Sequence, residues 1–354
     1  MFFHNLTTPV ISLAPMDGVT DAPYRFIMKK YGDPDLTFTE FTNVIGLCRG
    51  ADRLFLDFVY DDIERPAIAQ VFGNDPEYFY HAAKIVAALG FDGIDINMGC
   101  PARNVAEKGS GAGLIRVPEI AKEIVRQVQK GVADYFQDFT LTGIAENVPA
   151  LIAAANATHA AFDREKQRVN FTISVKTRVG YDSIVIDEWI KHLTEVAPDW
   201  ITVHGRTLKQ LYTGNADWDA IATAVDNTHI PVFANGDVTS SNAAVAVLKH
   251  TKAAGVMLGR GTYGNPWIFR TKQQIKSLTS PIIDYVPSDA EKIQAILEHT
   301  QRHWELKGEK AFVQMRKNLA WYISSIPDAS ALRQKLMQAP NPDAVRHLIY
   351  SEFN

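Results

Sequence analysis

The chain contains too few cysteines for a disulfide scaffold or a zinc ribbon. Only Cys48 and Cys100 occur among its 354 residues, and neither has a second cysteine or a histidine at metal-ligand spacing. Disulfide-rich folds and zinc ribbons need such pairs, whereas sparse, unpaired cysteines suit a reducing compartment. We therefore expect a cytoplasmic protein that holds no metal.

Long hydrophobic runs and an excess of positive charge are also missing. The longest alanine-rich stretch, 149–161, is interrupted by polar residues and is too short to span a bilayer. The first residues lack the basic and then apolar pattern of a signal peptide. The net charge is −4, so the chain has no overall basic field. We expect no membrane association, and any contact with RNA must come from local patches.

Short apolar runs alternate with amphipathic segments over the first three quarters of the chain. Eight of these runs are predicted strands: Val10–Ala14, Leu36–Glu40, Ala67–Phe72, Gly93–Asn97, Thr172–Thr177, Trp200–His204, Pro231–Asn235 and Gly255–Leu258. Plausible helices follow most of them: Ala22–Tyr31, Pro76–Leu89, Pro118–Val128, Ile186–Val196, Trp218–Val225 and Ser240–Lys249. Eight such units are typical of an α/β (β/α)8 TIM barrel, here over 1–280. A doubly wound open sheet is the alternative.

Two segments depart from this alternation. Beyond Pro281 no strand pattern remains, and predicted helices over 288–306, 309–325, 329–338 and 342–353 indicate a small all-helical C-terminal domain over 288–354. Residues 131–170 form a connection from a helix to a strand that is much longer than usual. Such connections lie at the bottom face of a barrel. We interpret 131–170 as a surface insertion without a catalytic role.

The segment that follows the predicted strand Gly93–Asn97 carries the most chemical information. It reads Asn-Met-Gly-Cys-Pro from Asn97, and glycines follow at 109, 111 and 113. A free cysteine is usually a small buried hydrophobe. Here, however, proline and glycine flank Cys100 at the point where a barrel strand passes into its functional loop. The motif therefore indicates a functional cysteine.

The predicted carboxyl ends of the other strands are polar or rich in glycine, and in a barrel these ends share one face. Strands seven and eight end in Asn235-Gly236-Asp237 and Gly259-Arg260-Gly261, a usual place for a phosphate site. Lys176 could neutralise the N1/O2 edge of a reduced flavin, while Gln70, Asn97 and His204 could bond to its ring. No G-x-G-x-x-G follows a strand, so a nicotinamide cofactor would bind only transiently.

Taken together, these motifs closely resemble the tRNA-dihydrouridine synthases. The resemblance extends from about residue 8 to the end of the chain, except for 131–170. In the tail, Met315-Arg316-Lys317-Asn318 is similar to the family's Arg-Lys-His element, with Asn318 in place of the usual histidine. The resemblance to the family is carried by these segments: Ala14–Asp21, Thr39–Phe41, Gln70–Gly73, Asn97–Pro101, Val175–Gly180, His204–Thr207, Gln210–Gly214, Asn235–Asp237, Gly259–Gly261, Pro266-Trp267 and Trp321-Tyr322.

The resemblance implies an FMN-binding barrel, a helical tRNA-binding domain, and NADPH-dependent reduction of the uracil C5–C6 bond in tRNA. It implies that Cys100 is the catalytic acid, and that Asn97 and Arg178 bind the uracil. Arg206, Lys209, Arg316 and Lys317 are candidates for tRNA phosphate contacts, whereas Trp321 and Tyr322 are expected in the core of the tail. The implied FMN contacts are Pro15, Met16, Gln70, Lys176, His204, Asn235, Gly236, Asp237, Gly259 and Arg260.

Two other functions remain open at this point. One is an FMN-dependent reductase or dehydrogenase of a free pyrimidine, although a small substrate gives no reason for a helical tail. The other is a tRNA-binding protein in which flavin chemistry is secondary, although Cys100, Lys176 and His204 are all present. We expect a monomer. The sequence does not indicate which uridine is reduced, nor whether NADPH or NADH is preferred.

Overall fold

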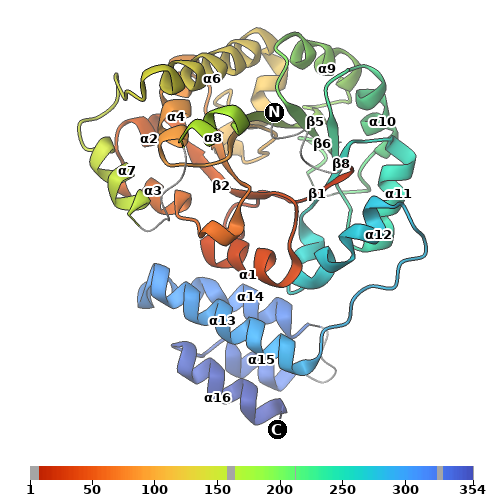
Figure 1. Ribbon diagram of the computed structural model, residues 1–354. Coiled ribbons are helices and arrows are strands. Elements are labelled where there is room, and N and C mark those ends of the chain that lie inside the picture. Colours follow the sequence, from red (N-terminus) through yellow and green to blue (C-terminus); the bar gives the residue numbers. More distant parts are fainter. Residues whose placement is uncertain (1–7, 158–163, 212, 325–329, 354) are drawn as a thin grey trace.

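Eight parallel strands form a closed barrel in the computed structural model, which describes residues 8–157, 164–211, 213–324 and 330–353 (Figure 1). Each strand pairs with its neighbours in chain order, and a parallel bridge between Ser12 and Leu36 joins the first strand to the second. This confirms the predicted barrel and every predicted strand. The strands are β1 Val10–Leu13, β2 Thr37–Asn43, β3 Ala67–Phe72, β4 Gly93–Met98, β5 Thr172–Gly180, β6 Trp200–Thr207, β7 Val232–Asn235 and β8 Gly255–Leu258.

Helices cover the outside of the barrel, and polar side chains fix where several of them begin. Asp21, Asp75, Asp217 and Ser240 each accept a hydrogen bond from a backbone N–H in the first turn of the helix that follows. The main outer helices are α1 Ala22–Gly32, α4 Pro76–Ala88, α6 Pro118–Asp138, α9 Ile186–Glu195, α10 Trp218–Asp226 and α11 Ser241–Thr251. Shorter helices are α2 Val44–Cys48, α3 Asp52–Phe55, α5 Arg103–Ala106 and α12 Lys272–Lys276.

The interior of the barrel changes character along its axis. Its lower part is a separate apolar cluster that includes Phe38, Ile68, Met257 and the stacked rings of Trp200 and Phe233, whose centroids are 5.6 Å apart. Because side chains alternate along a strand, the next inward position lies two residues further on. The next inward residue after Ile68 on β3 is Gln70, and the next after Trp200 on β6 is Thr202. The upper interior is therefore polar although it is buried.

The long connection before β5 lies along the outside of the barrel. Helix α6 continues to Asp138, beyond its predicted end at Val128, because Tyr135 and Phe136 extend its buried face. Helices α7 Val148–Asn156 and α8 Arg164–Asn170 follow. Gln167 donates to the carbonyls of Ala87 and Phe91 at the bottom of the barrel, but Asn147 donates to the carbonyl of Gly50 beyond β2. The expected position at the bottom face is therefore right for only part of the segment.

The tail forms helices with an apolar cluster of their own (Figure 1). They are α13 Asp289–Lys307, α14 Met315–Tyr322, α15 Ser330–Leu336 and α16 Pro342–Phe353. Helix α13 begins with a capping box that Ser288 and Glu291 form. The segment predicted as one helix over 309–325 consists of a 3-10 helix, Glu309–Gln314, followed by α14.

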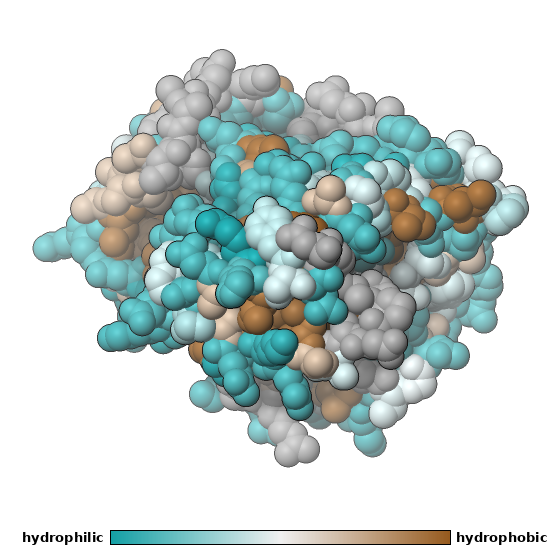
Figure 2. All heavy atoms as spheres, turned by 90° about the horizontal axis from the view of Figure 1, so that it is seen from below, coloured by the Kyte–Doolittle hydropathy of each residue, from teal (hydrophilic) through white to brown (hydrophobic). Residues whose placement is uncertain are grey.

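The tail packs directly on the barrel. Lys307 pairs with Asp21 at 2.6 Å and Glu298 pairs with Lys30 at 2.7 Å. Trp321 was expected in the core of the tail. Instead, it stacks on Tyr263 of the barrel, with ring centroids 3.9 Å apart. The reason is that the turn at Gly264 lies against the backbone of Trp321. Seen from below, the surface is mostly hydrophilic, with only small separate apolar areas (Figure 2).

Candidate active site at the barrel mouth

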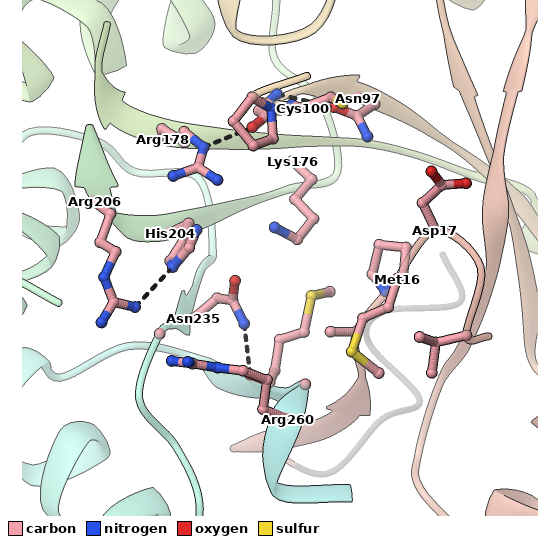
Figure 3. Close-up of a pocket in the computed structure, with 18 of the residues that line it drawn as sticks. Met16, Asp17, Asn97, Cys100, Lys176, Arg178, His204, Arg206, Asn235 and Arg260 are labelled. Atoms are coloured by element: carbon pink, nitrogen blue, oxygen red, sulfur yellow. Dashed lines mark hydrogen bonds between the residues drawn. The ribbon is translucent and has the colours of Figure 1, made fainter. Parts of the chain in front are cut away.

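A cavity of about 790 Å³ lies at the carboxyl ends of the strands (Figure 3). This volume is in the range of small-molecule and cofactor sites, about 300–1,000 Å³. The structure brings most of the predicted site residues together in its wall. They are Pro15, Met16, Gln70, Asn97, Cys100, Lys176, Arg178, His204, Arg206, Asn235, Gly236, Asp237, Gly259 and Arg260.

Three predicted residues do not line the cavity. Lys209 is exposed on the loop after β6, and Arg316 is exposed on α14. Lys317, also on α14, is half-buried. Its Nζ lies 3.6 Å from the position that a Cβ atom on Gly18 would occupy. The tail therefore places positive charge beside the loop that carries Met16 and Asp17. Asn318 of the same helix is buried and donates to Sδ of Met315 at 3.8 Å.

The loop that carries Cys100 is held by side chains on two strands. Asn97 Oδ1 accepts the backbone N–H groups of Gly99 (3.0 Å) and Cys100 (2.8 Å). Arg178 Nε donates to the carbonyl of Gly99 at 2.6 Å. Gly111 approaches so closely, with a φ of 55°, that an added Cβ would lie 3.0 Å from Cβ of Cys100. These contacts present the thiol to the cavity at a fixed position.

Burial sets the protonation state of the three groups at the centre of the cavity. It raises the pKa of the Cys100 thiol above its usual value, so the thiol is protonated at neutral pH. It lowers the pKa of Lys176 to about 8, with Arg178 acting in the same direction. His204 has its pKa held well below the usual value, first by burial and then by Lys176, and is therefore neutral.

The opposite wall is built around Asp237. Its carboxylate accepts from Arg206 at 2.7 Å and from Arg260 at 2.8 Å, and the backbone N–H of Ala216 donates to it. Although burial opposes the charge, the N–H of Ala216 and the two guanidinium groups hold the pKa of Asp237 below its usual value. Arg206, predicted as a candidate for a tRNA phosphate contact, is buried in this arrangement and lines the cavity.

Gly236 occupies a position that no other residue can fill without strain. Its φ is 120°, and an added Cβ would lie 2.7 Å from Cβ of Ala216 and 3.0 Å from Cδ2 of His204. We expect Gly236→Ala to lower the free energy of unfolding by about 1–3 kcal/mol and to displace His204. Urea unfolding measures the first effect. Gly308→Ala is the control, since Gly308 has a φ of 74° and nothing within 4 Å, and its cost must be smaller.

Sequence reasoning missed several groups of the site. Asp17 and Tyr263 line the cavity from the loops after β1 and β8. Asp95 is fully buried one layer below Asn97 on β4, and burial raises its pKa to about 6. Period-two alternation places Asp95 on the inward face with Asn97, and this was the available signal. Among the described residues, no group of three or more metal-ligating side chains occurs, and no helix is long and apolar enough to cross a membrane.

The barrel, with titratable groups gathered at the carboxyl ends of its strands, defines the class of (β/α)8-barrel enzymes. Comparison with known proteins identifies the family. The family model described as dihydrouridine synthase (Dus) matches residues 12–157 and 149–352, so the chain belongs to the dihydrouridine synthase family.

Curated relatives match nearly the whole chain. A probable tRNA-dihydrouridine synthase 1 from Synechocystis is 33% identical over 92% of this chain and 81% of its own length. The tRNA-dihydrouridine synthase B of Pasteurella multocida is 31% identical over 94% of this chain and 89% of its own. A probable tRNA-dihydrouridine synthase from Staphylococcus epidermidis is 30% identical over 98% and 95%.

Proposed function

We propose that the chain is a tRNA-dihydrouridine synthase that uses FMN and NADPH to reduce the C5–C6 double bond of specific uridines in tRNA. The observation that carries the proposal is the presence, in one cavity, of the protonated thiol of Cys100 and the half-buried ammonium of Lys176. Such a pair combines a proton donor with a group that stabilises negative charge, and a ring reduction needs both.

The residues present fit an FMN molecule. The side chain of Lys176 makes no hydrogen bond or ion pair with any other described residue, so a half-buried cation in the cavity wall has no anionic partner among them. The N1/O2 edge of a reduced flavin has the matching charge. Elsewhere in the wall, Gly236, Gly259 and Arg260 line the cavity, and their backbone groups and guanidinium suit a phosphate. Gln70, His204 and Asn235 complete the contacts proposed for the ring system.

When bound beside these residues, FMN would supply the hydride for C6 of the uracil, with NADPH as the reductant. After C6 has accepted the hydride, the uracil ring carries negative charge over C5 and the C4 carbonyl, and C5 requires a proton. We assign this proton to the thiol of Cys100, because its raised pKa keeps it protonated at neutral pH. Asn97 and Arg178 flank the thiol, and they hold the uracil beside it. The target base must leave its stack to enter the cavity.

Binding of tRNA is assigned to exposed cations on the rim of the cavity and on the tail. Lys209 and Arg316 are exposed, and Lys317 lies beside the loop after β1. Lysine and arginine contacts to phosphate position a nucleic acid without reading its sequence. Arg206 is not included in this set, since it is buried against Asp237.

We expect the affinity for FMN to depend on the charge of Lys176. Lys176→Met is expected to raise the dissociation constant of FMN about 10–100-fold, the value of a hydrogen bond to a charged group. Burial lowers the pKa of Lys176 to about 8, so its side chain is almost wholly cationic about one pH unit below that value and loses the charge above it. The affinity of the native chain for FMN should therefore be constant below about pH 7 and fall above pH 8. The affinity of Lys176→Met should not show this fall. Fluorescence titration measures both effects. Lys209→Met, outside the cavity, must leave them unchanged.

The function is tested directly with purified protein. A visible absorption spectrum reports bound flavin, and incubation with NADPH and unmodified tRNA is followed by analysis for dihydrouridine. A flavin spectrum together with dihydrouridine formation supports the proposal. A flavin spectrum without a change in tRNA favours the reductase of a free pyrimidine, and absence of flavin removes the proposed chemistry altogether.

Charge reversal on the tail separates tRNA from a free base as the substrate. Arg316→Glu should weaken tRNA binding and reduce its dependence on salt, because one phosphate contact is lost. Reduction of free uracil or uridine, if it occurs, must not respond to this change. A variant that reduces tRNA as well as the native chain does shows that Arg316 has no part in binding.

A further inference from the structure

A chain of buried hydrogen bonds runs from the interior of the barrel to the cysteine loop. Asp95 Oδ2 accepts from Gln70 Nε2 at 2.6 Å, and Gln70 Oε1 accepts from Asn97 Nδ2 at 2.8 Å. Asn97 Oδ1 in turn accepts the N–H groups of Gly99 and Cys100. Asp95, Gln70 and Asn97 come from the adjacent strands β3 and β4, and Asp95 and Gln70 are fully buried.

The two ends of this chain fix its direction. An ionised carboxylate can only accept hydrogen bonds, and a backbone N–H can only donate. Between them lie two amides, Gln70 and Asn97, each of which could present either its oxygen or its nitrogen. Because Asp95 demands the nitrogen of Gln70, the oxygen of Gln70 must face Asn97. The oxygen of Asn97 is then directed at the cysteine loop.

This direction decides what Asn97 offers to the cavity. Its oxygen is occupied by the two backbone N–H groups, and one hydrogen of its nitrogen is given to Gln70. The remaining polar group is the second Nδ2 hydrogen, a donor, and Asn97 lines the cavity (Figure 3). A donor there suits a carbonyl oxygen on the ligand. Asp95 itself does not line the cavity.

The position of Asp95 is difficult to explain by stability alone. A buried carboxylate costs free energy that an apolar residue of similar size would not cost. Its second oxygen accepts from Ser174 at 2.5 Å, and no ion pair reaches it among the described residues. The barrel layer directly below is filled by apolar side chains such as Ile68 and Trp200.

We propose that Asp95 is a positioning residue: through Gln70 and Asn97 it fixes the cysteine loop and presents an N–H donor to the ligand. The part that concerns the ligand rests on the function proposed above. The part that concerns the loop does not. The proposal is specific because it predicts which exchange of side chains reverses the hydrogen-bond chain without breaking it.

The test exchanges the carboxylate and the amide at the two positions on β4. In Asn97→Asp, a carboxylate oxygen at position 97 faces Oε1 of Gln70, and both atoms are acceptors. Gln70 then lies between two carboxylates and cannot make good hydrogen bonds to both. In Asp95→Asn, one buried group remains unpaired, because the new amide cannot accept from both Ser174 and Gln70. In the double variant every bond can re-form, and the two bonds that Gln70 makes with positions 95 and 97 reverse their direction. The new amide at position 95 donates to Gln70, Gln70 donates to the new carboxylate at position 97, and that carboxylate accepts from the loop.

Two readouts need neither flavin nor tRNA. The first is the equilibrium constant for unfolding in urea. Each single variant is expected to raise it at least about fivefold, the effect of one unpaired buried group, and the double variant should return to within about threefold of the native value. The second is the rate of alkylation of Cys100 by iodoacetamide, measured with Cys48→Ala as the common background. It should change in the single variants and return in the double variant.

A third readout concerns the donor. The reversed chain presents a carboxylate oxygen to the cavity where the native chain presents an N–H, so dihydrouridine formation in the double variant should stay at least about tenfold below the native rate even though the fold has recovered. Additive effects on unfolding, with no recovery of the alkylation rate, would overturn the proposal. So would native turnover in the double variant. If the native chain forms no dihydrouridine, the proposed function fails, and the hydrogen-bond chain is judged on the first two readouts.

Discussion

Replacing Cys100 by alanine is expected to lower the rate of dihydrouridine formation by about 10²–10⁴-fold, the usual contribution of a general acid. The thiol lines the cavity, and burial keeps it protonated at neutral pH by raising its pKa. The variant keeps the backbone bonds that hold its loop, since Asn97 accepts from the N–H of residue 100 whatever its side chain. Flavin binding and the oxidation of NADPH should therefore continue. Quantitative nucleoside analysis of the tRNA measures the loss.

The second cysteine supplies a matched control. Cys48 is also buried and has a pKa raised by burial to about 12, but it lies on α2 outside the cavity and its Sγ donates to the carbonyl of Tyr78. Cys48→Ala should keep the native rate within about twofold. In the native chain the rate should hold through neutral pH and decline only on the alkaline side, where first Lys176 and then the thiol lose their protons. A Cys100→Ala variant with more than a tenth of the native rate would show that another group protonates C5.

Strand periodicity explains why so much of the site was predictable. Lys176 and Arg178 occupy alternate positions at the end of β5, and Asn97 ends β4. In a closed barrel such ends meet at one face whatever the intervening loops do. The cavity could therefore be assembled from the sequence without knowledge of distances. The glycine at 236 was recognisable for the same reason, since a turn after a strand needs a backbone that tolerates positive φ.

The parts that were not predicted depend on contacts between distant segments. Arg206 occurs at a strand end like the other site residues, but its role depends on whether Asp237, from the next strand end, accepts its charge. Trp321 reads as a core residue of a helix until Tyr263 is placed beside it. Asp95 is a third case. Alternation indicates that its side chain points inward, but not that its carboxylate accepts a hydrogen bond from the amide of Gln70 in the buried interior.

The join between barrel and tail depends on a buried ion pair next to the loop after β1. Arg25 Nε donates to Glu64 at 2.6 Å, with both side chains 1% exposed, and its other nitrogens donate to the carbonyls of Thr20 and Val59. Asp21, which precedes α1, pairs with Lys307 of the tail. Glu64 also accepts the N–H of Asp61, and the side chain of Asp61 pairs with Arg302 of the tail at 3.4 Å. The pair therefore fixes two segments on which the tail rests.

Arg25→Met is expected to lower the free energy of unfolding by about 3–5 kcal/mol at pH 7, because it leaves the carboxylate of Glu64 buried without a partner. Burial already raises the pKa of Glu64 against the pull of Arg25, and loss of Arg25 must raise it further. The carboxyl group then becomes neutral at mildly acidic pH. The deficit relative to the native chain should accordingly shrink as the pH falls from 7 to 5. Urea unfolding followed by circular dichroism at both values measures it.

An exposed pair separates burial from charge in this prediction. Lys191 and Asp187 are 3.1 Å apart on α9, with side chains 56% and 60% exposed, and Lys191→Met should cost no more than about 1 kcal/mol. Glu64→Gln, which keeps an oxygen for Arg25, should cost less than Arg25→Met and should lack its pH dependence. If Arg25→Met is as stable as the Lys191 variant, the ion pair contributes nothing. If its deficit does not change with pH, the cost comes from the lost packing and carbonyl contacts of Arg25 rather than from a stranded carboxylate.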